Sequence, residues 1–79
     1  MIGKDMIEKE GIFNVQVIEK AMAQELGVYD LQIDYAVVRD GRNLDLMTLI
    51  EPHLTPHLAL LVAAKLGDVR LIDNVLLSL

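Results

Sequence analysis

The chain has 79 residues, of which 53% are hydrophobic, and it carries a net charge of −5 with no cysteine. This length allows one small domain, and the negative charge with scattered basic residues argues against a nucleic acid or an anionic membrane as partner. Without cysteine the chain can form neither disulfides nor thiolate metal sites, and we expect it to be cytoplasmic.

The N-terminal segment, residues 1–13, is interpreted as a lead-in, either loose or holding a short helix, ahead of a single domain over residues 14–79. It lacks the continuous apolar region that a signal peptide needs. The longest apolar run, residues 58–64, is too short to cross a bilayer as a helix, which takes about twenty residues. No membrane contact is therefore expected.

A helix is predicted over residues 14–26. Hydrophobic residues recur there at three- and four-residue steps, at Val15, Ile18, Met22 and Leu26. Asn14 is a candidate N-cap, and Gly27 is a candidate left-handed residue that ends the helix. The outer face of the helix is expected to carry Glu19, Lys20, Gln24 and Glu25.

A strand is predicted over residues 31–39, where β-branched and aromatic residues are frequent, followed by a turn at residues 40–43. Charged residues in and just after this strand, Asp34, Arg39 and Asp40, suggest a salt-bridged strand end. Residues 44–50 fit either a short strand or a helical turn. Two prolines make residues 51–56 a loop.

A β-hairpin is predicted for the C-terminal part of the chain, with Gly67 and Asp68 as a type II′ turn. This turn would place Leu66 opposite Val69, and Val62 opposite Asp73. Because both faces of such a hairpin are apolar, we expect it to be covered on both sides. The competing interpretation is a single helix over residues 58–66, which the leucines and alanines there also favour.

The fold class that these elements predict is α+β: one or more helices packed on a small antiparallel sheet of about three strands that ends in the β-hairpin. A body this small cannot bury so many aliphatic side chains. We therefore expect apolar surface to remain for a partner, either a second copy of the chain or a neighbouring domain.

Polar residues on the last predicted strand, Arg70, Asp73 and Asn74, are the strongest candidates for a role beyond packing. Arg70 and Asp73 should point to opposite faces of the hairpin, so a direct bond between them is not expected. Hydrogen bonds from Asp73 and Asn74 to loop backbone are the structural interpretation. Contact with a ligand or another domain is the functional one.

Two histidines four residues apart, His53 and His57, have a spacing that metal ligands can share, with Glu51 as a conceivable third. Pro52 and Pro56 break any helix between them, and loop histidines are the favoured interpretation. No catalytic, cofactor-binding or metal-binding residue is assigned, because no nucleophile elbow or glycine-rich phosphate loop is present.

Three blocks of this sequence resemble the C-terminal domain of pantothenate synthetase, the pantoate–β-alanine ligase family. They are the helix of residues 14–26, the Asp-Tyr-x-x-x-Arg-Asp strand of residues 34–40 with Leu44, and the Leu-Gly-Asp-x-Arg-Leu-Ile-Asp-Asn string of residues 66–74. The blocks occur in the family's order over residues 12–79. Arg70, Asp73 and Asn74 belong to the last block and are interpreted as a structural signature.

The resemblance implies an α+β lid on a nucleotide-binding domain, in an enzyme that uses ATP and magnesium to form pantoyl adenylate, which β-alanine then attacks. The family's N-terminal domain and its phosphate-binding Met-Ser-x-Arg-Asn segment have no counterpart here. We therefore expect this chain to be inactive alone, with the N-terminal nucleotide-binding domain as its partner. The alternative is a stand-alone homodimeric interaction or regulatory module. In either case we expect the isolated chain to form a homodimer.

Overall fold

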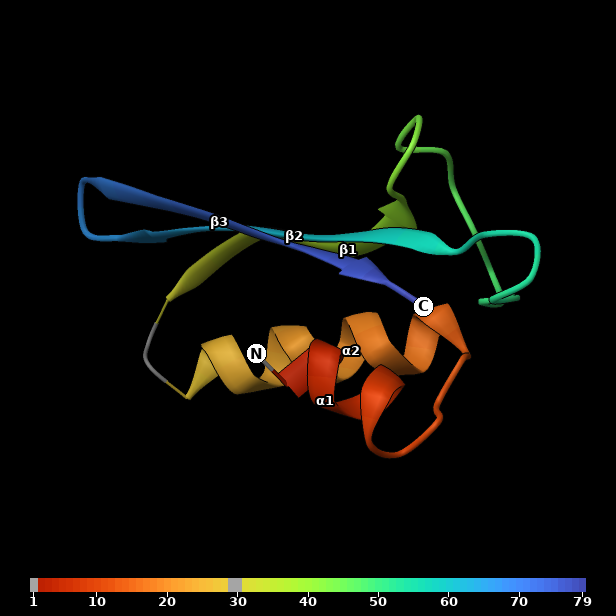
Figure 1. Cartoon of the computed structure of the whole chain (residues 1–79). Helices are drawn as coiled ribbons and strands as arrows, with labels where there is room; N and C mark the ends of the chain where they lie inside the picture. The colour runs from red at the N-terminus through yellow and green to blue at the C-terminus, as the bar shows by residue number, and fades with distance from the viewer. Residues whose placement is uncertain (1, 29–30) are drawn as a thin grey trace.

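The computed structural model describes residues 2–28 and 31–79. Two helices lie on one face of a three-stranded antiparallel sheet of order β1-β2-β3, which confirms the predicted α+β class (Figure 1). The end of the β2–β3 hairpin projects beyond the helices. The elements are α1 (Ile2–Glu8), α2 (Val15–Gly27), β1 (Gln32–Asp40), β2 (His57–Leu66) and β3 (Val69–Ser78).

Helix α2 begins where the sequence predicts and ends differently. Asn14 is the N-cap, and its side-chain oxygen accepts a hydrogen bond from the Val17 amide at 3.2 Å. The helix includes Gly27 and is capped by Val28, whose φ of −62° is right-handed. The predicted left-handed glycine cap is therefore wrong, because the Val28 amide closes the last turn on the Glu25 carbonyl instead.

The N-terminal segment, for which the sequence allowed either a loose lead-in or a short helix, contains the short helix α1. Met6 and Ile7 of α1 are buried in the same core as the rest of the chain. A side chain at Gly3 would place its Cβ 2.8 Å from Leu60 Cδ2 and from Met22 Sδ. Glycine at this position therefore lets α1 pack closely against both α2 and the sheet.

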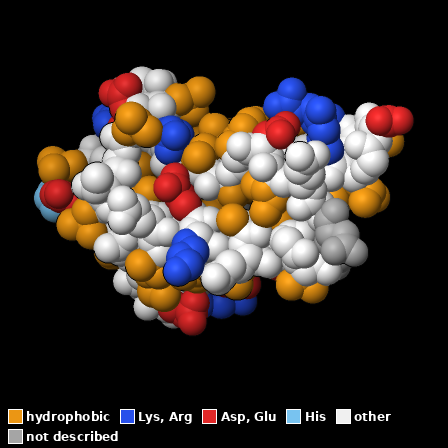
Figure 2. Space-filling view, turned by 180° about the vertical axis from the view of Figure 1, so that it is seen from behind, with side chains coloured by type: hydrophobic (Ala, Val, Ile, Leu, Met, Phe, Trp, Pro, Cys, Tyr) orange, Lys and Arg blue, Asp and Glu red, His pale blue; other side chains and the backbone are white. Residues whose placement is uncertain are grey.

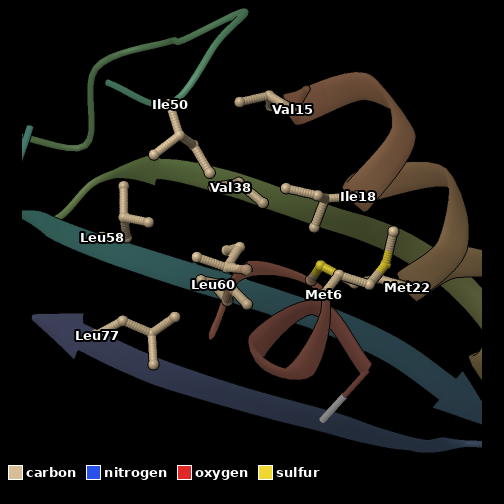
Figure 3. Close-up of a cluster of buried hydrophobic side chains, with 10 residues drawn as sticks. Met6, Val15, Ile18, Met22, Val38, Ile50, Leu58, Leu60 and Leu77 are labelled. Carbon is tan, nitrogen blue, oxygen red and sulfur yellow. The ribbon is translucent and has the colours of Figure 1, made fainter. Parts of the chain in front are cut away.

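The hydrophobic core fills the space between the helices and one face of the sheet (Figure 3). Ile18 and Met22 of α2 point toward Val38 of β1 and Leu60 of β2, and all four are almost completely buried. Periodic apolar residues on α2 meet alternate residues of the strands, as expected for a helix packed on a sheet.

The β2–β3 hairpin has the predicted register. Leu66 pairs with Val69, and Val62 pairs with Asp73. Gly67 has a φ of 61°, the positive value that the first central residue of a type II′ turn requires. The competing helix over residues 58–66 is excluded, because all of these residues lie in β2.

The described part of the chain, in contrast, covers only one face of the hairpin. Both helices pack on the same face (Figure 1), and Ile72 and Leu76, which point the other way, are 64% and 72% exposed. Two helices of this length cover one side of the sheet only. The apolar surface that the composition predicts is therefore present, much of it on β3.

Residues 44–50 are neither a strand nor a helical turn. Two isolated bridges hold this segment, one between Leu46 and Arg39 and one between Leu49 and Asn14. Its last residue, Ile50, is buried in the core. Residues 51–56 form a loop, as predicted.

Candidate functional site

The three polar residues singled out on β3 do not form one cluster. Arg70 lies on the face away from the helices, where its Nε atom is 3.5 Å from Asp34 Oδ2 of β1. Asp73 pairs with Val62 on the helix-facing side and accepts a hydrogen bond from the Asn74 amide at 2.9 Å. Arg70 and Asp73 thus point to opposite faces, as predicted, and the Asp73 oxygen bonds within its own strand rather than to loop backbone.

The Arg70–Asp34 pair links the two outer strands across β2. Asp34 can reach it because the register of β1 shifts between Ile33 and Tyr35, where Asp34 is the extra residue. Both side chains are partly exposed, and an ion pair of this kind contributes about 0–1 kcal/mol. The pair is therefore compatible with the observed alignment of β1 and β3, and its contribution to the stability of the fold is small.

A cavity of about 340 Å³ lies between the C-terminal end of α2 and the helix-facing side of the hairpin. Asp73 contributes to its wall, so one of the sequence-predicted residues does reach a possible binding site. The residues that line it are mostly aliphatic, with two that are acidic: Met22, Glu25, Leu26, Leu31, Val62, Ala64, Leu71, Ile72 and Asp73.

The chemistry of this cavity suits an apolar group rather than a phosphate. Its charged side chains, Glu25 and Asp73, are both acidic and repel anions, and its remaining lining is aliphatic. Neither a nucleophile nor a basic side chain contributes to the cavity lining that the structure describes. The site therefore fits an apolar side chain or segment of a partner better than a nucleotide.

A second polar cluster lies at the opposite end of the sheet, where β1 ends. Asp40 is buried, and its two carboxylate oxygens accept hydrogen bonds from Arg42 Nε at 3.2 Å and Arg42 Nη2 at 3.0 Å. The Arg42 backbone amide also donates to Asp40, and Arg42 Nη2 reaches the Leu54 carbonyl. This arrangement fixes the turn after β1 against the following loop.

The salt-bridged strand end that the sequence suggests is present, but its three charged residues pair with partners outside the set and not with one another. Asp34 pairs with Arg70, while Arg39 pairs with Glu19 of α2 and Asp40 pairs with Arg42. The physical reason is the geometry of a strand: the bulge and the alternation of side chains send these three residues in different directions.

Acid should weaken the fold partly through Asp40. Hydrogen bonds from the Arg42 side chain and backbone lower the pKa of the Asp40 carboxyl below its ordinary value of 3.8. A carboxyl whose pKa is depressed by folding stabilises the folded state above pH 3.8, and this contribution is lost as the pH falls through the folded-state value. Urea unfolding between about pH 6 and pH 2 should show the loss.

The Asp40→Asn variant supplies the control for this effect. It should be less stable than the wild type at neutral pH, and the difference should shrink below pH 3.8, where the wild-type carboxyl takes up its proton. Arg42→Ala, which removes the donor, should behave in the same way. A constant difference at every pH would contradict the assignment.

The two histidines have separate partners. His57 Nδ1 lies 3.2 Å from Ser78 Oγ on the neighbouring strand, and His53 Nε2 lies 4.0 Å from Glu51 Oε2. Among residues 2–28 and 31–79, no group of three or more histidine, cysteine, aspartate or glutamate side chains is placed to hold a metal ion. The two histidines therefore do not converge with Glu51 on one point.

Glu19 has a structural role that the sequence interpretation missed. It was assigned to the outer face of the helix, but it is three-quarters buried against β1. Its Oε2 atom accepts hydrogen bonds from the Val38 amide at 2.9 Å and from Arg39 Nη1 at 3.2 Å. The spacing Val15, Glu19, Met22 could have revealed it, because these positions share one side of a helix.

These observations define a class: a small α+β domain with two helices on one face of a three-stranded antiparallel sheet and a mostly aliphatic cavity beside the end of α2. A family model described as pantoate-beta-alanine ligase matches residues 3–76. The chain belongs to this family. No curated protein sequence matches it. In the part of the chain that the structure describes, no helix is long and apolar enough to cross a membrane.

Proposed function

We propose that this chain is the C-terminal lid of an ATP-dependent ligase that joins pantoate to β-alanine. The observation that carries the proposal is the family match over residues 3–76, which extends over both helices and nearly all of the sheet. The α+β fold agrees with a lid of this kind. Catalytic groups then come from a separate nucleotide-binding domain.

The cavity beside α2 does not suit ATP or magnesium by itself. The cavity lining presents Glu25 and Asp73, which repel phosphate, and the described residues bring together no cluster of three carboxylates or histidines. The two substrates and the nucleotide are therefore assigned to the partner domain. The contribution of this chain is to close over that domain and keep water from a reactive acyl adenylate.

Complementation with a separate domain tests this function. The purified chain is mixed with the nucleotide-binding domain of a family ligase, and AMP formation is measured with ATP, magnesium, pantoate and β-alanine. AMP should form faster in the mixture than with the nucleotide-binding domain alone, and the chain alone should form none. Calorimetry of the same mixture measures whether the two proteins bind.

Two results would contradict the proposal. AMP formation by the chain alone would show that it holds catalytic groups of its own. A mixture that neither binds nor gains activity would remove the lid role.

A further inference from the structure

Strand β3 forms one edge of the sheet, and no strand among residues 2–28 and 31–79 pairs with its outer side. In a two-residue hairpin the residues that flank the turn, here Leu66 and Val69, exchange backbone hydrogen bonds, and every second residue after them does the same. The intervening residues direct their N–H and C=O groups away from β2. They are Arg70, Ile72, Asn74, Leu76 and Ser78. The Asn74 amide agrees with this pattern, because it bonds to the Asp73 side chain.

The opposite edge of the sheet is protected at the end of β1, over residues 38–40. On β1 the Val38 amide points away from β2 and donates a hydrogen bond to the Glu19 side chain. Arg39 forms an isolated β-bridge with Leu46. The Asp40 amide donates to the Asp45 carbonyl at 3.2 Å. Folded proteins generally protect both edges, because an unpaired edge is a template for pairing with another strand.

The side chains of β3 add apolar surface to this free backbone. Ile72 and Leu76 are exposed on one face, and Leu71 is 46% exposed on the other. Hydrophobic side chains also reach the surface on the back of the molecule, where charged groups separate them (Figure 2). On β3, in contrast, exposed aliphatic residues accompany an unpaired edge, the combination that strand addition uses.

We propose that β3 pairs antiparallel with β3 of a second copy of this chain, with Asn74 opposite Asn74 on the two-fold axis. In this register Ile72 lies opposite Leu76 of the partner, and Leu71 lies opposite Leu77. In this register each residue whose backbone N–H and C=O point away from β2 lies opposite such a residue of the second copy, so the two can exchange hydrogen bonds. The two sheets join into one of six strands.

Charge selects this register over its neighbours. Moving one strand by two residues in one direction places Asp73 opposite Asp73, where like charges repel. The same shift in the other direction places Asp73 opposite Leu77. With Asn74 on the axis, Asp73 lies opposite Val75 and no like charges are directly opposed. The strand is thus complementary to itself, as an interface with two-fold symmetry requires.

Asp73 limits the strength of this dimer. Its carboxylate bonds to the Asn74 amide, which must be released for pairing. The two Asp73 side chains also become diagonal neighbours across the axis, about 7–8 Å apart. We therefore expect Asp73→Asn to tighten dimerisation about fivefold at low salt, because a neutral amide removes the repulsion.

Sedimentation velocity over a range of chain concentrations tests the proposal. The wild type should pass from monomer to dimer as its concentration rises, and Ile72→Lys should stay monomeric. The matched control, Leu54→Lys, changes a leucine that is 60% exposed in the loop before β2 and should dimerise like the wild type. Circular dichroism checks that all variants are folded.

Cysteine cross-linking tests the register. The chain has no cysteine, so Asn74→Cys introduces a single thiol on the proposed axis. Opposed residues of a hydrogen-bonded pair have Cα atoms about 5.5 Å apart, within the range that a disulfide spans. Asn74→Cys should therefore form a disulfide dimer. Ser78→Cys lies opposite Arg70 and should not.

Three results would overturn the proposal. The first is a wild type that is monomeric at every concentration. The second is dimerisation that Ile72→Lys and Leu54→Lys affect equally, and the third is equal cross-linking by the two cysteine variants. If the chain is monomeric and Ile72→Lys blocks its binding to a family nucleotide-binding domain, then that domain, and not a second copy, occupies β3. The sedimentation experiment uses the chain alone, so its outcome is independent of the ligase assay.

Discussion

Replacing Leu60 with alanine should leave much of the chain unfolded in water at room temperature. Leu60 is in the middle of β2, is fully buried, and points toward Met6 and Met22 at the centre of the core (Figure 3). Removing a buried leucine side chain costs about 2–5 kcal/mol, through lost burial and the cavity left behind. A domain of this size has a total stability of about 3–5 kcal/mol, so the loss is comparable to the whole.

Urea unfolding followed by far-ultraviolet circular dichroism measures this effect as a lower midpoint or a missing folded baseline. Leu54→Ala is the matched control, because the same chemical change at an exposed loop position should alter stability by less than about 0.5 kcal/mol. Equal midpoints for Leu60→Ala and the wild type would show that the helices do not pack on this face of the sheet as observed.

Sequence patterns predicted those parts of the fold that local chemistry decides. Asn14 caps α2 because the cap involves only a side chain and the first turn of the same helix. The hairpin register follows from Gly67, since a two-residue turn fixes every later pair. The family resemblance also depended on these segments. It predicted the fold class, and the match over residues 3–76 confirmed the family.

Features that depend on distant segments were not predicted. Glu19 was placed on the solvent side of α2, because nothing nearby in the sequence shows that an edge amide of β1 needs an acceptor. Residues 44–50 have no regular structure: Leu46 bridges back to Arg39 across the turn after β1, and Leu49 bridges to Asn14, which lies far along the chain. The open face of β3 was missed because the hydrophobic pattern reports that a face is apolar, not whether the chain has an element to cover it.

The candidate site shows the same division. Asp73 was identified from its unusual position on an apolar strand face, and it does line the cavity. Glu25, the second carboxylate there, was interpreted as a solvated helix residue, because the cavity exists only once α2 packs beside the hairpin. The Asp40–Arg42 pair was also missed, although its two members are only two residues apart in the sequence. Its bidentate geometry depends on the turn that follows β1.

Replacing Gly41 with alanine should lower the stability of the fold, because the added Cβ would press against the backbone of the neighbouring strand. An added Cβ would lie 3.0 Å from the His57 carbonyl carbon and 3.1 Å from the Leu58 amide nitrogen. The Gly41 amide also donates to the His57 carbonyl at 2.7 Å, which holds the start of β2 beside the turn. Because the obstructing atoms are backbone, relief requires the two segments to separate, and overpacking of this kind costs about 1–3 kcal/mol.

Gly27→Ala is the matched control for Gly41→Ala. An added Cβ at Gly27 meets nothing within 4 Å, and Gly27 lies in α2 with a φ that is not positive. Alanine there should therefore raise stability by about 0.5–1 kcal/mol, because it restricts the unfolded chain and favours the helix. The two variants should move the urea midpoint in opposite directions. A Gly41→Ala protein as stable as the wild type would mean that the turn after β1 does not rest against the first residues of β2.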